Sequence, residues 1–250
     1  MTLKEADFFE VATPTGPMRV HRFQPATGAP PPTVILYSEI FQVTGPIRRL
    51  AARVAGEGFE VLVPEIYHEY EAPGSILAYD QAGSDRGNLL KHEKPVAAFD
   101  SDAWALIDWA LARPSPWKQV GTLGFCIGGH LAFRAALHPA VAAASCFYPT
   151  DIHAGSLGRG KCDDTLARIP EIEAELLLIW GRQDPHVPLA GRRIVYEALT
   201  AAERWFQWHE FNAAHAFARD EGLRYDAAAS RLALDMTIEL FQRRLKAILI

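Results

Sequence analysis

Cys126 stands between glycines in the segment GTLGFCIGGHLAF, where a strand pattern meets a helix pattern. The unit Gly124-Phe125-Cys126-Ile127-Gly128 matches a nucleophile elbow, with cysteine in the position more often held by serine. At so tight a turn, side chains two residues before and after the nucleophile would collide with neighbouring backbone. The turn also places the sulfur at a helix N-terminus, which favours a thiolate and a developing oxyanion. The sequence therefore predicts that Cys126 is a catalytic nucleophile.

The other thiols and two hydroxyls lack this setting. Cys146 and Cys162 are interpreted as buried or surface residues, because most free cysteines behave as small hydrophobes. Ser38 and Ser145 have no elbow around them. The glycines around Cys126 do not form a dinucleotide or phosphate loop, since neither GxGxxG nor GxxxxGK[ST] is present. The odd number of cysteines, without CxxC spacing, indicates reduced thiols.

An acid and a base follow later strand patterns, in the order that such an elbow requires. Asp184 lies in GRQDPHVP directly after an apolar run, although an aspartate in that position can also simply begin a turn before proline. His215 lies in FNAAHAFARD, after the last strand pattern. His186 is a possible base but precedes that strand, and we expect it at a loop or rim. A triad of Cys126, Asp184 and His215 is predicted.

Strand and helix patterns alternate along the chain after an opening hairpin at residues 8–23. Strands that are apolar on both faces and joined by crossover helices indicate a mostly parallel, doubly wound α/β sheet with helices on both faces. Two irregular stretches, residues 65–96 and 150–170, follow strands and are expected to build the ligand crevice. We expect one domain over residues 1–250, with strands at 33–38, 59–64, 119–125, 142–149, 174–181 and 204–211 and helices at 46–55, 99–112, 129–137, 189–199 and 223–249.

Composition narrows the classes of function. The 250 residues are 49% hydrophobic and 22% charged, which is typical of a globular domain. The net charge is -5 and no Lys/Arg run occurs, so nucleic acid is not an expected partner. The N-terminus lacks an apolar signal-peptide core, and no later stretch is apolar for the roughly 18 residues that a membrane helix needs, so we expect a cytoplasmic protein without a membrane partner. The sequence lacks HExxH and any Cys/His cluster, so no metal site is expected.

With these motifs in this order, the sequence resembles the dienelactone hydrolase family of the α/β-hydrolase superfamily. The similar segments span nearly the whole chain: YSEIFQVTGPIRRLAARVAGEGFEVLVPEIY, GFCIGGHLAF, GRQDPHVP and NAAHAFAR. The resemblance implies an α/β-hydrolase fold and a hydrolase that opens an enol-lactone to a carboxylic acid. It implies Cys126 as nucleophile, His215 as base and later acid, and Asp184 as the residue that orients His215. No cofactor is implied. We expect a small-molecule lactone or ester substrate, and a monomer or small homo-oligomer.

Further site residues follow from the resemblance. In the family, a glutamate in the Glu-Ile-Phe motif approaches the resting thiol and pairs with an arginine after the catalytic histidine; these are Glu39 and Arg219 here. From the residues alone, Glu39 is a possible acceptor of the thiol proton or one half of an exposed ion pair. Ile40 and Ile127 are positioned to supply the two backbone N–H groups of an oxyanion hole.

The chain departs from the family pattern between Tyr70 and Val96, where the family supplies an arginine and aromatic side chains that hold a substrate carboxylate. Arg86 is the candidate for that arginine. Ala216 follows the predicted base where a serine is frequent. The reaction type therefore transfers better than the substrate, and a general carboxylesterase or thioesterase of the same fold is the main alternative. A non-catalytic ligand-binding protein on a hydrolase scaffold is the alternative from another class.

Overall fold

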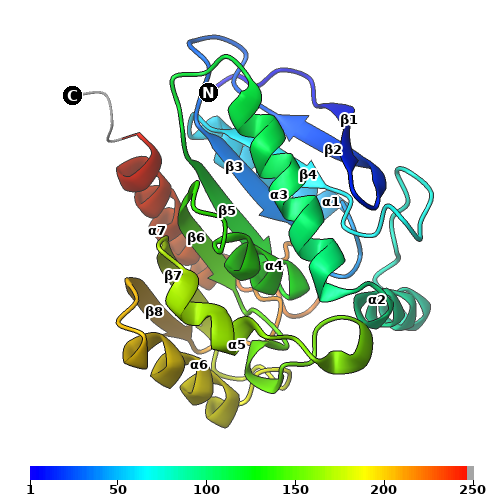
Figure 1. Cartoon of the computed structure of the whole chain (residues 1–250), viewed down its shortest axis with the longest axis vertical. Coiled ribbons are helices and arrows are strands. Elements are labelled where there is room, and N and C mark those ends of the chain that lie inside the picture. Colours follow the sequence, from blue (N-terminus) through cyan, green and yellow to red (C-terminus); the bar gives the residue numbers. More distant parts are fainter. Residues whose placement is uncertain (247–250) are drawn as a thin grey trace.

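The computed structural model describes residues 1–246 and contains one eight-stranded sheet between helices (Figure 1). Its strands are β1 (Asp7–Thr13), β2 (Gly16–Phe23), β3 (Thr33–Tyr37), β4 (Glu60–Pro64), β5 (Val120–Phe125), β6 (Val141–Phe147), β7 (Glu175–Gly181) and β8 (Phe206–Phe211). The spatial order is β1-β2-β4-β3-β5-β6-β7-β8. The sheet is parallel from β4 through β8, whereas β2 pairs antiparallel with both β1 and β4. This confirms the predicted fold class.

Helices cover both faces of the sheet because its central strands are buried on both sides. Two helices pack on one face, α1 (Gly45–Gly56) and α7 (Ala227–Leu245). The opposite face carries α3 (Val96–Ala112), α4 (Ile127–Ala135) and α6 (Leu189–Ala201). The edge strand β8 is only partly buried along its whole length. Two separate apolar cores therefore fix the sheet, and the carboxyl ends of its parallel strands remain available for loops that carry chemistry.

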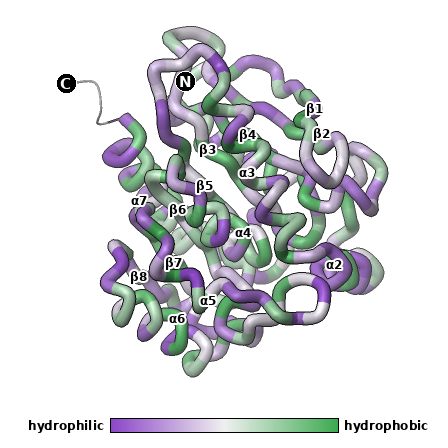
Figure 2. The backbone as a smooth tube through the Cα atoms, viewed as in Figure 1, coloured by the Kyte–Doolittle hydropathy of each residue, from purple (hydrophilic) through white to green (hydrophobic). Residues whose placement is uncertain are grey.

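The segment between β4 and α3 contains an additional helix, α2 (Gln81–Glu93). The expectation of irregular structure throughout residues 65–96 is therefore wrong. Few apolar residues and two internal glycines weaken the helical pattern, and Figure 2 shows α2 as a mostly hydrophilic segment. Asp80 caps the helix by accepting a hydrogen bond of 2.8 Å from the Gly83 amide. Gly87 permits close packing, because a Cβ there would lie 2.6 Å from the Ile40 carbonyl oxygen.

The other predicted elements appear within a few residues of their predicted positions. The last helix begins at Ala227 rather than at residue 223, because the Asp226 side chain caps it by accepting from the amides of Ala228 and Ala229. Its predicted end at residue 249 lies outside the described residues. The predicted irregular stretch at 150–170 holds only short elements: α5 (Thr165–Arg168) and single 3-10 turns at Ile152–Ala154, Arg159–Lys161 and Ile169–Glu171.

Candidate active site

Cys126 occupies the sharp turn between β5 and α4. Its backbone has φ 60° and ψ −123°, in the left-handed half of conformational space that a residue with a side chain rarely adopts. A Cβ on Gly124 would lie 1.8 Å from the Gly128 carbonyl oxygen, and one on Gly128 would lie 2.2 Å from the Tyr37 carbonyl oxygen. Both positions therefore require glycine, as the sequence predicts for an elbow.

Backbone hydrogen bonds hold this turn in place. The Cys126 amide donates to the Phe147 carbonyl at the end of β6 over 3.1 Å, and the Cys126 carbonyl accepts from the Gly129 amide over 3.0 Å. The same carbonyl accepts from the Thr150 amide over 3.3 Å, which ties the loop after β6 to the elbow. The sulfur-bearing side chain is half-buried, so it remains open to a ligand.

Asp184 and His215 meet beside this turn, each on the loop that follows its strand, β7 and β8 respectively. The His215 Nδ1 lies 2.6 Å from the Asp184 Oδ2, and both residues are buried. The His186 amide donates to Asp184 Oδ1 over 2.8 Å, which fixes the orientation of the carboxylate. The structure therefore brings together the acid and the base that the sequence predicts.

His215 and Asp184 each shift the pKa of the other toward its charged form. Burial lowers the pKa of His215, but the charge of the Cys126 thiolate and the hydrogen bonds to Asp184 and Cys126 outweigh burial and raise the pKa to about 10. Burial also raises the pKa of Asp184, but hydrogen bonding to His215 and its charge bring that pKa below the usual value. A proton on His215 is therefore stabilised by both of its neighbours.

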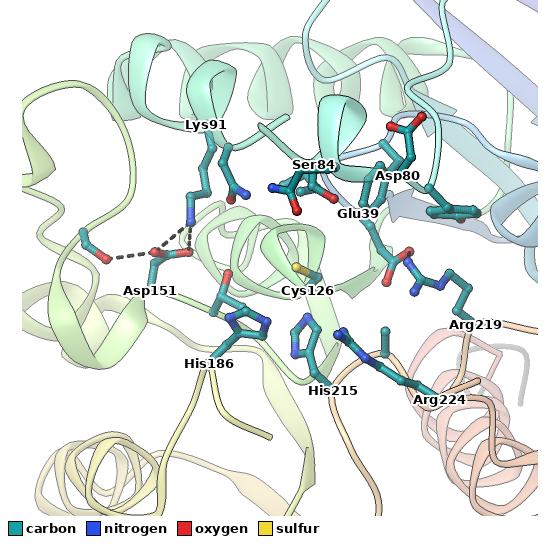
Figure 3. Close-up of a pocket in the computed structure, with 18 of the residues that line it drawn as sticks. Glu39, Asp80, Ser84, Lys91, Cys126, Asp151, His186, His215, Arg219 and Arg224 are labelled. Atoms are coloured by element: carbon teal, nitrogen blue, oxygen red, sulfur yellow. Dashed lines mark hydrogen bonds and ion pairs between the residues drawn. The ribbon is translucent and has the colours of Figure 1, made fainter. Parts of the chain in front are cut away.

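A cavity of about 720 Å³ opens over Cys126 and His215. Figure 3 shows the two side chains between a polar wall that carries Lys91 and Asp151 and another that carries Glu39 and Arg219. The cavity is within the size range of small-molecule sites.

Glu39 and Arg219 form the ion pair expected from the family resemblance. Arg219 Nη1 lies 3.4 Å from Glu39 Oε2, and the guanidinium stacks over Tyr79 at 4.3 Å from the ring centroid. Burial raises the pKa of Glu39 although Arg219 partly offsets it. The Tyr79 hydroxyl lies 2.7 Å from the Thr44 hydroxyl, which anchors the aromatic ring. Glu39 is thus held next to the cavity in an environment that favours its uptake of a proton.

Arg86 does not line this cavity. Its Nε donates to Glu71 Oε1 over 2.7 Å, and the pair fastens α2 to the preceding loop. The expectation that Arg86 binds a substrate carboxylate is therefore not supported by its position. The sequence contained no motif that would show which positively charged residue of this segment faces the ligand.

Several cavity residues were not predicted. Lys91 on α2, Asp151 after β6 and Arg224 before α7 all line the cavity, as does His186, which the sequence places only at a rim. The His186 ring lies 4.6 Å from that of His215 in an edge-to-face arrangement. The signal for His186 was its closeness to Asp184 in the chain, whereas the other three have no local pattern that marks them.

The other thiols, and the two serines near strand ends that lack an elbow, lie away from the cavity. Cys146 is buried in β6, where burial raises its pKa, and Cys162 is exposed on a loop. Ser145 is buried and its hydroxyl lies 2.8 Å from that of Thr237. Ser38 is buried and does not line the cavity. Of the thiols and of the two serines considered from the sequence, Cys126 alone lines the cavity within residues 1–246.

One group of side chains has the spacing of metal ligands. The ligand atoms of His68, Glu69 and Asp102 lie within 4.8 Å of one another, outside the cavity. The Lys94 ammonium is buried among them and forms ion pairs with both Glu69 and Asp102. This ammonium supplies the positive charge that the carboxylates require, so the group is better described as a structural ion-pair cluster.

A doubly wound sheet with a thiol on a strand-to-helix elbow, beside a buried carboxylate–imidazole pair, defines the α/β-hydrolase class. Each part of the arrangement comes from a different strand end, which is how this fold assembles its sites.

Comparison with known proteins gives the family within that class. Residues 18–245 match the model of the dienelactone hydrolase family, and the chain belongs to this family. A Saccharomyces cerevisiae protein named "Putative carboxymethylenebutenolidase" is 41% identical over 96% of this chain and 92% of its own length. The carboxymethylenebutenolidase of Pseudomonas putida is 28% identical over 84% of this chain and 85% of its own. The crystal structure of a "Putative Dienelactone Hydrolase" from Klebsiella pneumoniae covers 97% of this chain and 100% of its own with a TM-score of 0.85 at 22% identity.

These comparisons show a hydrolase of ester or lactone bonds, rather than a non-catalytic binding protein on the same scaffold. Among the helices within residues 1–246, none combines the length and the apolar character that crossing a membrane requires.

Proposed function

We propose that this hydrolase opens an activated lactone or ester through a thioester on Cys126, with His215 as acid and base and Asp184 as its orienting partner. The observation that carries the proposal is the contact of 2.6 Å between His215 Nδ1 and Asp184 Oδ2 beside a cavity that Cys126 lines. Its geometry orients the imidazole so that the opposite nitrogen faces the thiol and the substrate.

Acylation begins when the Cys126 thiol transfers its proton to His215. The thiolate attacks the carbonyl carbon, and the tetrahedral intermediate collapses with cleavage of the carbon–oxygen bond of the ester. The departing alkoxide or enolate takes the proton from the His215 imidazolium. In a lactone, this oxygen remains attached to the acyl chain, so the ring opens without release of a second product. Glu39 is a second possible acceptor of the thiol proton, because burial raises its pKa.

Deacylation uses the same residues in reverse. Water transfers a proton to His215 as it attacks the thioester carbon, and the thiolate departs to leave a carboxylic acid. A positioned base of this kind contributes about 10² to 10⁴ in rate. Because a thiolate is itself a good leaving group, the first intermediate collapses forward only when the substrate oxygen also leaves readily. Enol-lactones and aryl esters therefore suit the site better than amides.

The backbone amides of Ile40 and Ile127 are proposed to stabilise the oxyanion. Ile127 is the first residue of α4, so its amide has no partner within the helix and the helix dipole adds to its positive character. Ile40 follows Glu39 at the carboxyl end of β3 and lines the same cavity. An oxyanion donor of this type typically contributes about 10² to 10³ in kcat.

Two observations favour lactones among the possible substrates. The chain belongs to the dienelactone hydrolase family, and relatives at 41% and 28% identity carry names derived from the opening of a butenolide lactone. A general carboxylesterase or thioesterase of this fold would differ by its relative kcat/KM for lactones and for p-nitrophenyl acyl esters.

Intact-mass spectrometry after brief incubation with a panel of enol-lactones and aryl esters tests the proposal. The wild-type chain should gain the mass of one acyl group, and Cys126→Ala should abolish both this adduct and hydrolysis. Cys146→Ala provides the control, because Cys146 is sealed within β6. Hydrolysis that survives Cys126→Ala undiminished would contradict the mechanism.

A further inference from the structure

The cavity has an unassigned polar wall opposite the Glu39–Arg219 pair, built around Lys91 and Asp151 (Figure 3). We propose that this wall, here called the Lys91–Asp151 subsite, binds a neutral hydroxyl group of the substrate. The enzyme then prefers hydroxylated lactones and esters to those that carry an alkyl or a carboxylate group at that position. This inference rests on the proposed function, because it concerns the substrate of the same site.

The subsite is built from two segments far apart in the sequence. Lys91 on the last turn of α2 has its Nζ 3.1 Å from both carboxylate oxygens of Asp151, on the loop after β6. The Ser156 hydroxyl donates to Asp151 Oδ1 over 2.8 Å. The Lys91 and Asp151 side chains are only 12% and 10% exposed, yet both line the cavity. Their charged groups are therefore accessible chiefly to whatever occupies the cavity.

The charges of this pair select against ionic ligands. Burial raises the pKa of Asp151, but Lys91 and the hydrogen bonds outweigh it and lower that pKa to about 2, so the carboxylate stays ionised at any working pH. A substrate carboxylate would have to displace Asp151 to pair with Lys91, and a substrate ammonium would have to displace Lys91, so either ion leaves one charge of the wall without its partner. A hydroxyl group donates to a carboxylate oxygen and accepts from an ammonium, and it brings no charge to desolvate.

Thr150 adds a further polar group to this wall. Its side chain lines the cavity and is only 7% exposed, and its hydroxyl interacts with the Asp151 carboxylate closely enough to help lower the pKa of Asp151. The Thr150 amide is bonded to the Cys126 carbonyl, which ties this residue to the elbow. Thr150 is therefore a third hydrogen-bonding group available to a substrate hydroxyl, beside Lys91 and Asp151.

The backbone of Asp151 is consistent with a positioned side chain. Asp151 has φ 69°, in the left-handed region, and its carbonyl accepts from the amides of Ala154 and Ser156 over 3.1 and 3.3 Å. A residue with a side chain rarely adopts this conformation, which persists where the surrounding structure enforces it. The tight loop therefore aims the carboxylate at Lys91 and the cavity.

Three p-nitrophenyl esters that differ only at the end of the acyl chain test the proposal: heptanoate, ω-hydroxyhexanoate and adipate. The first two are isosteric, with a methyl group exchanged for a hydroxyl, and adipate ends in a carboxylate. For the wild-type enzyme we expect kcat/KM for ω-hydroxyhexanoate to exceed that for heptanoate by about tenfold, with adipate lowest. The flexible chain allows the terminal group to reach the subsite without fixing its distance from the ester.

Two variants separate recognition from folding. Thr150→Val keeps the shape of the side chain. It should lower the ratio of kcat/KM for ω-hydroxyhexanoate to kcat/KM for heptanoate by about threefold. Asp151→Asn removes the negative charge and frees Lys91, so the adipate-to-heptanoate ratio should rise about tenfold. Glu71→Gln is the matched control, because Glu71 forms the other ion pair of α2, with Arg86, outside the cavity. This control should leave both ratios unchanged.

The outcomes distinguish this inference from the function on which it rests. Failure of the wild-type enzyme to hydrolyse any of the three esters contradicts the proposed function and the subsite together. Hydrolysis of all three with equal kcat/KM contradicts the subsite alone. If Asp151→Asn lowers the melting temperature but shifts no ratio, Lys91 and Asp151 serve only to fasten α2 to the loop after β6, and the proposal is overturned.

Discussion

The two sides of the cavity are built in different ways. On one side, Cys126 follows β5 directly, and Asp184 and His215 lie on the short loops after β7 and β8, so all three are positioned by strand ends. On the other side, Asp151 also follows a strand, β6, but its partner Lys91 comes from the helix α2, and an ion pair joins the two. The sheet therefore positions the reacting groups. The shape and polarity of the opposite wall depend instead on a contact between α2 and the loop after β6.

This difference predicts how the two sides respond to substitution. A change at a strand end removes a reacting group while the sheet and both apolar cores persist. A change in the opposite wall alters which ligand is held while the reacting groups stay in place. The first kind should appear mainly in kcat and the second in the ratios of kcat/KM among substrates. Substitutions on the two sides, each with a matched control, test whether kcat and substrate preference separate in this way.

The largest effect is expected for His215→Asn. Removal of the imidazole leaves the thiol without a proton acceptor and the leaving oxygen without a proton donor, so kcat/KM should fall by about 10⁴-fold. Steady-state hydrolysis of an aryl ester by the purified variant measures the loss, and the circular dichroism spectrum should remain that of the wild type.

His186→Asn is the matched control for that variant. His186 belongs to the same cavity and its ring contacts His215, but it forms no part of the proposed proton path. Its substitution should lower kcat/KM less than about tenfold, as expected from the loss of one polar contact. Equal losses in the two variants would show that the assignment of the base is wrong.

A smaller effect is expected from pH. Burial lowers the pKa of His215, but the charge and hydrogen bonds of Cys126 and Asp184 outweigh burial and raise that pKa to about 10, so the proton is retained through neutral pH and lost only near pH 10. The rate of acylation should therefore have an upper limb near that pH and fall tenfold for each further pH unit. Rapid-quench mass spectrometry of the acyl-enzyme formed from an alkyl ester, whose leaving oxygen needs the proton of His215, detects this limb.

The effect of Cys126 on the pKa of His215 can also be measured without turnover. In Cys126→Ala the thiolate charge and its hydrogen bond are removed, so the pKa of His215 should fall from about 10. Titration of the histidine ring by NMR measures the change. An unchanged titration in Cys126→Ala would mean that the sulfur does not interact with this imidazole.

The same contrast explains what the sequence predicted and what it did not. The elbow glycines, and the positions of Asp184 and His215 just after strand patterns, are constraints of local backbone geometry, so they are visible in the residues themselves. The pairing of Lys91 with Asp151 depends on how α2 packs against the loop after β6, and no spacing in the chain encodes it. The family resemblance indicated Glu39 and Arg219, which local patterns alone would have left ambiguous.

Arg86 is a residue whose role could not be predicted from local patterns, because its contacts depend on how α2 packs. Its substitution should have the smallest effect of those considered. Arg86→Ala should change kcat/KM for every ester by less than about twofold, because the side chain lies outside the cavity and is paired with Glu71. The free energy of unfolding should fall by at most about 1 kcal/mol, since the Arg86 side chain is 40% exposed and solvent weakens the pair. Urea unfolding monitored by fluorescence measures this change. A selective loss of adipate hydrolysis in Arg86→Ala would instead mean that this arginine reaches the substrate carboxylate, and that α2 turns a different face to the cavity when ligand is bound.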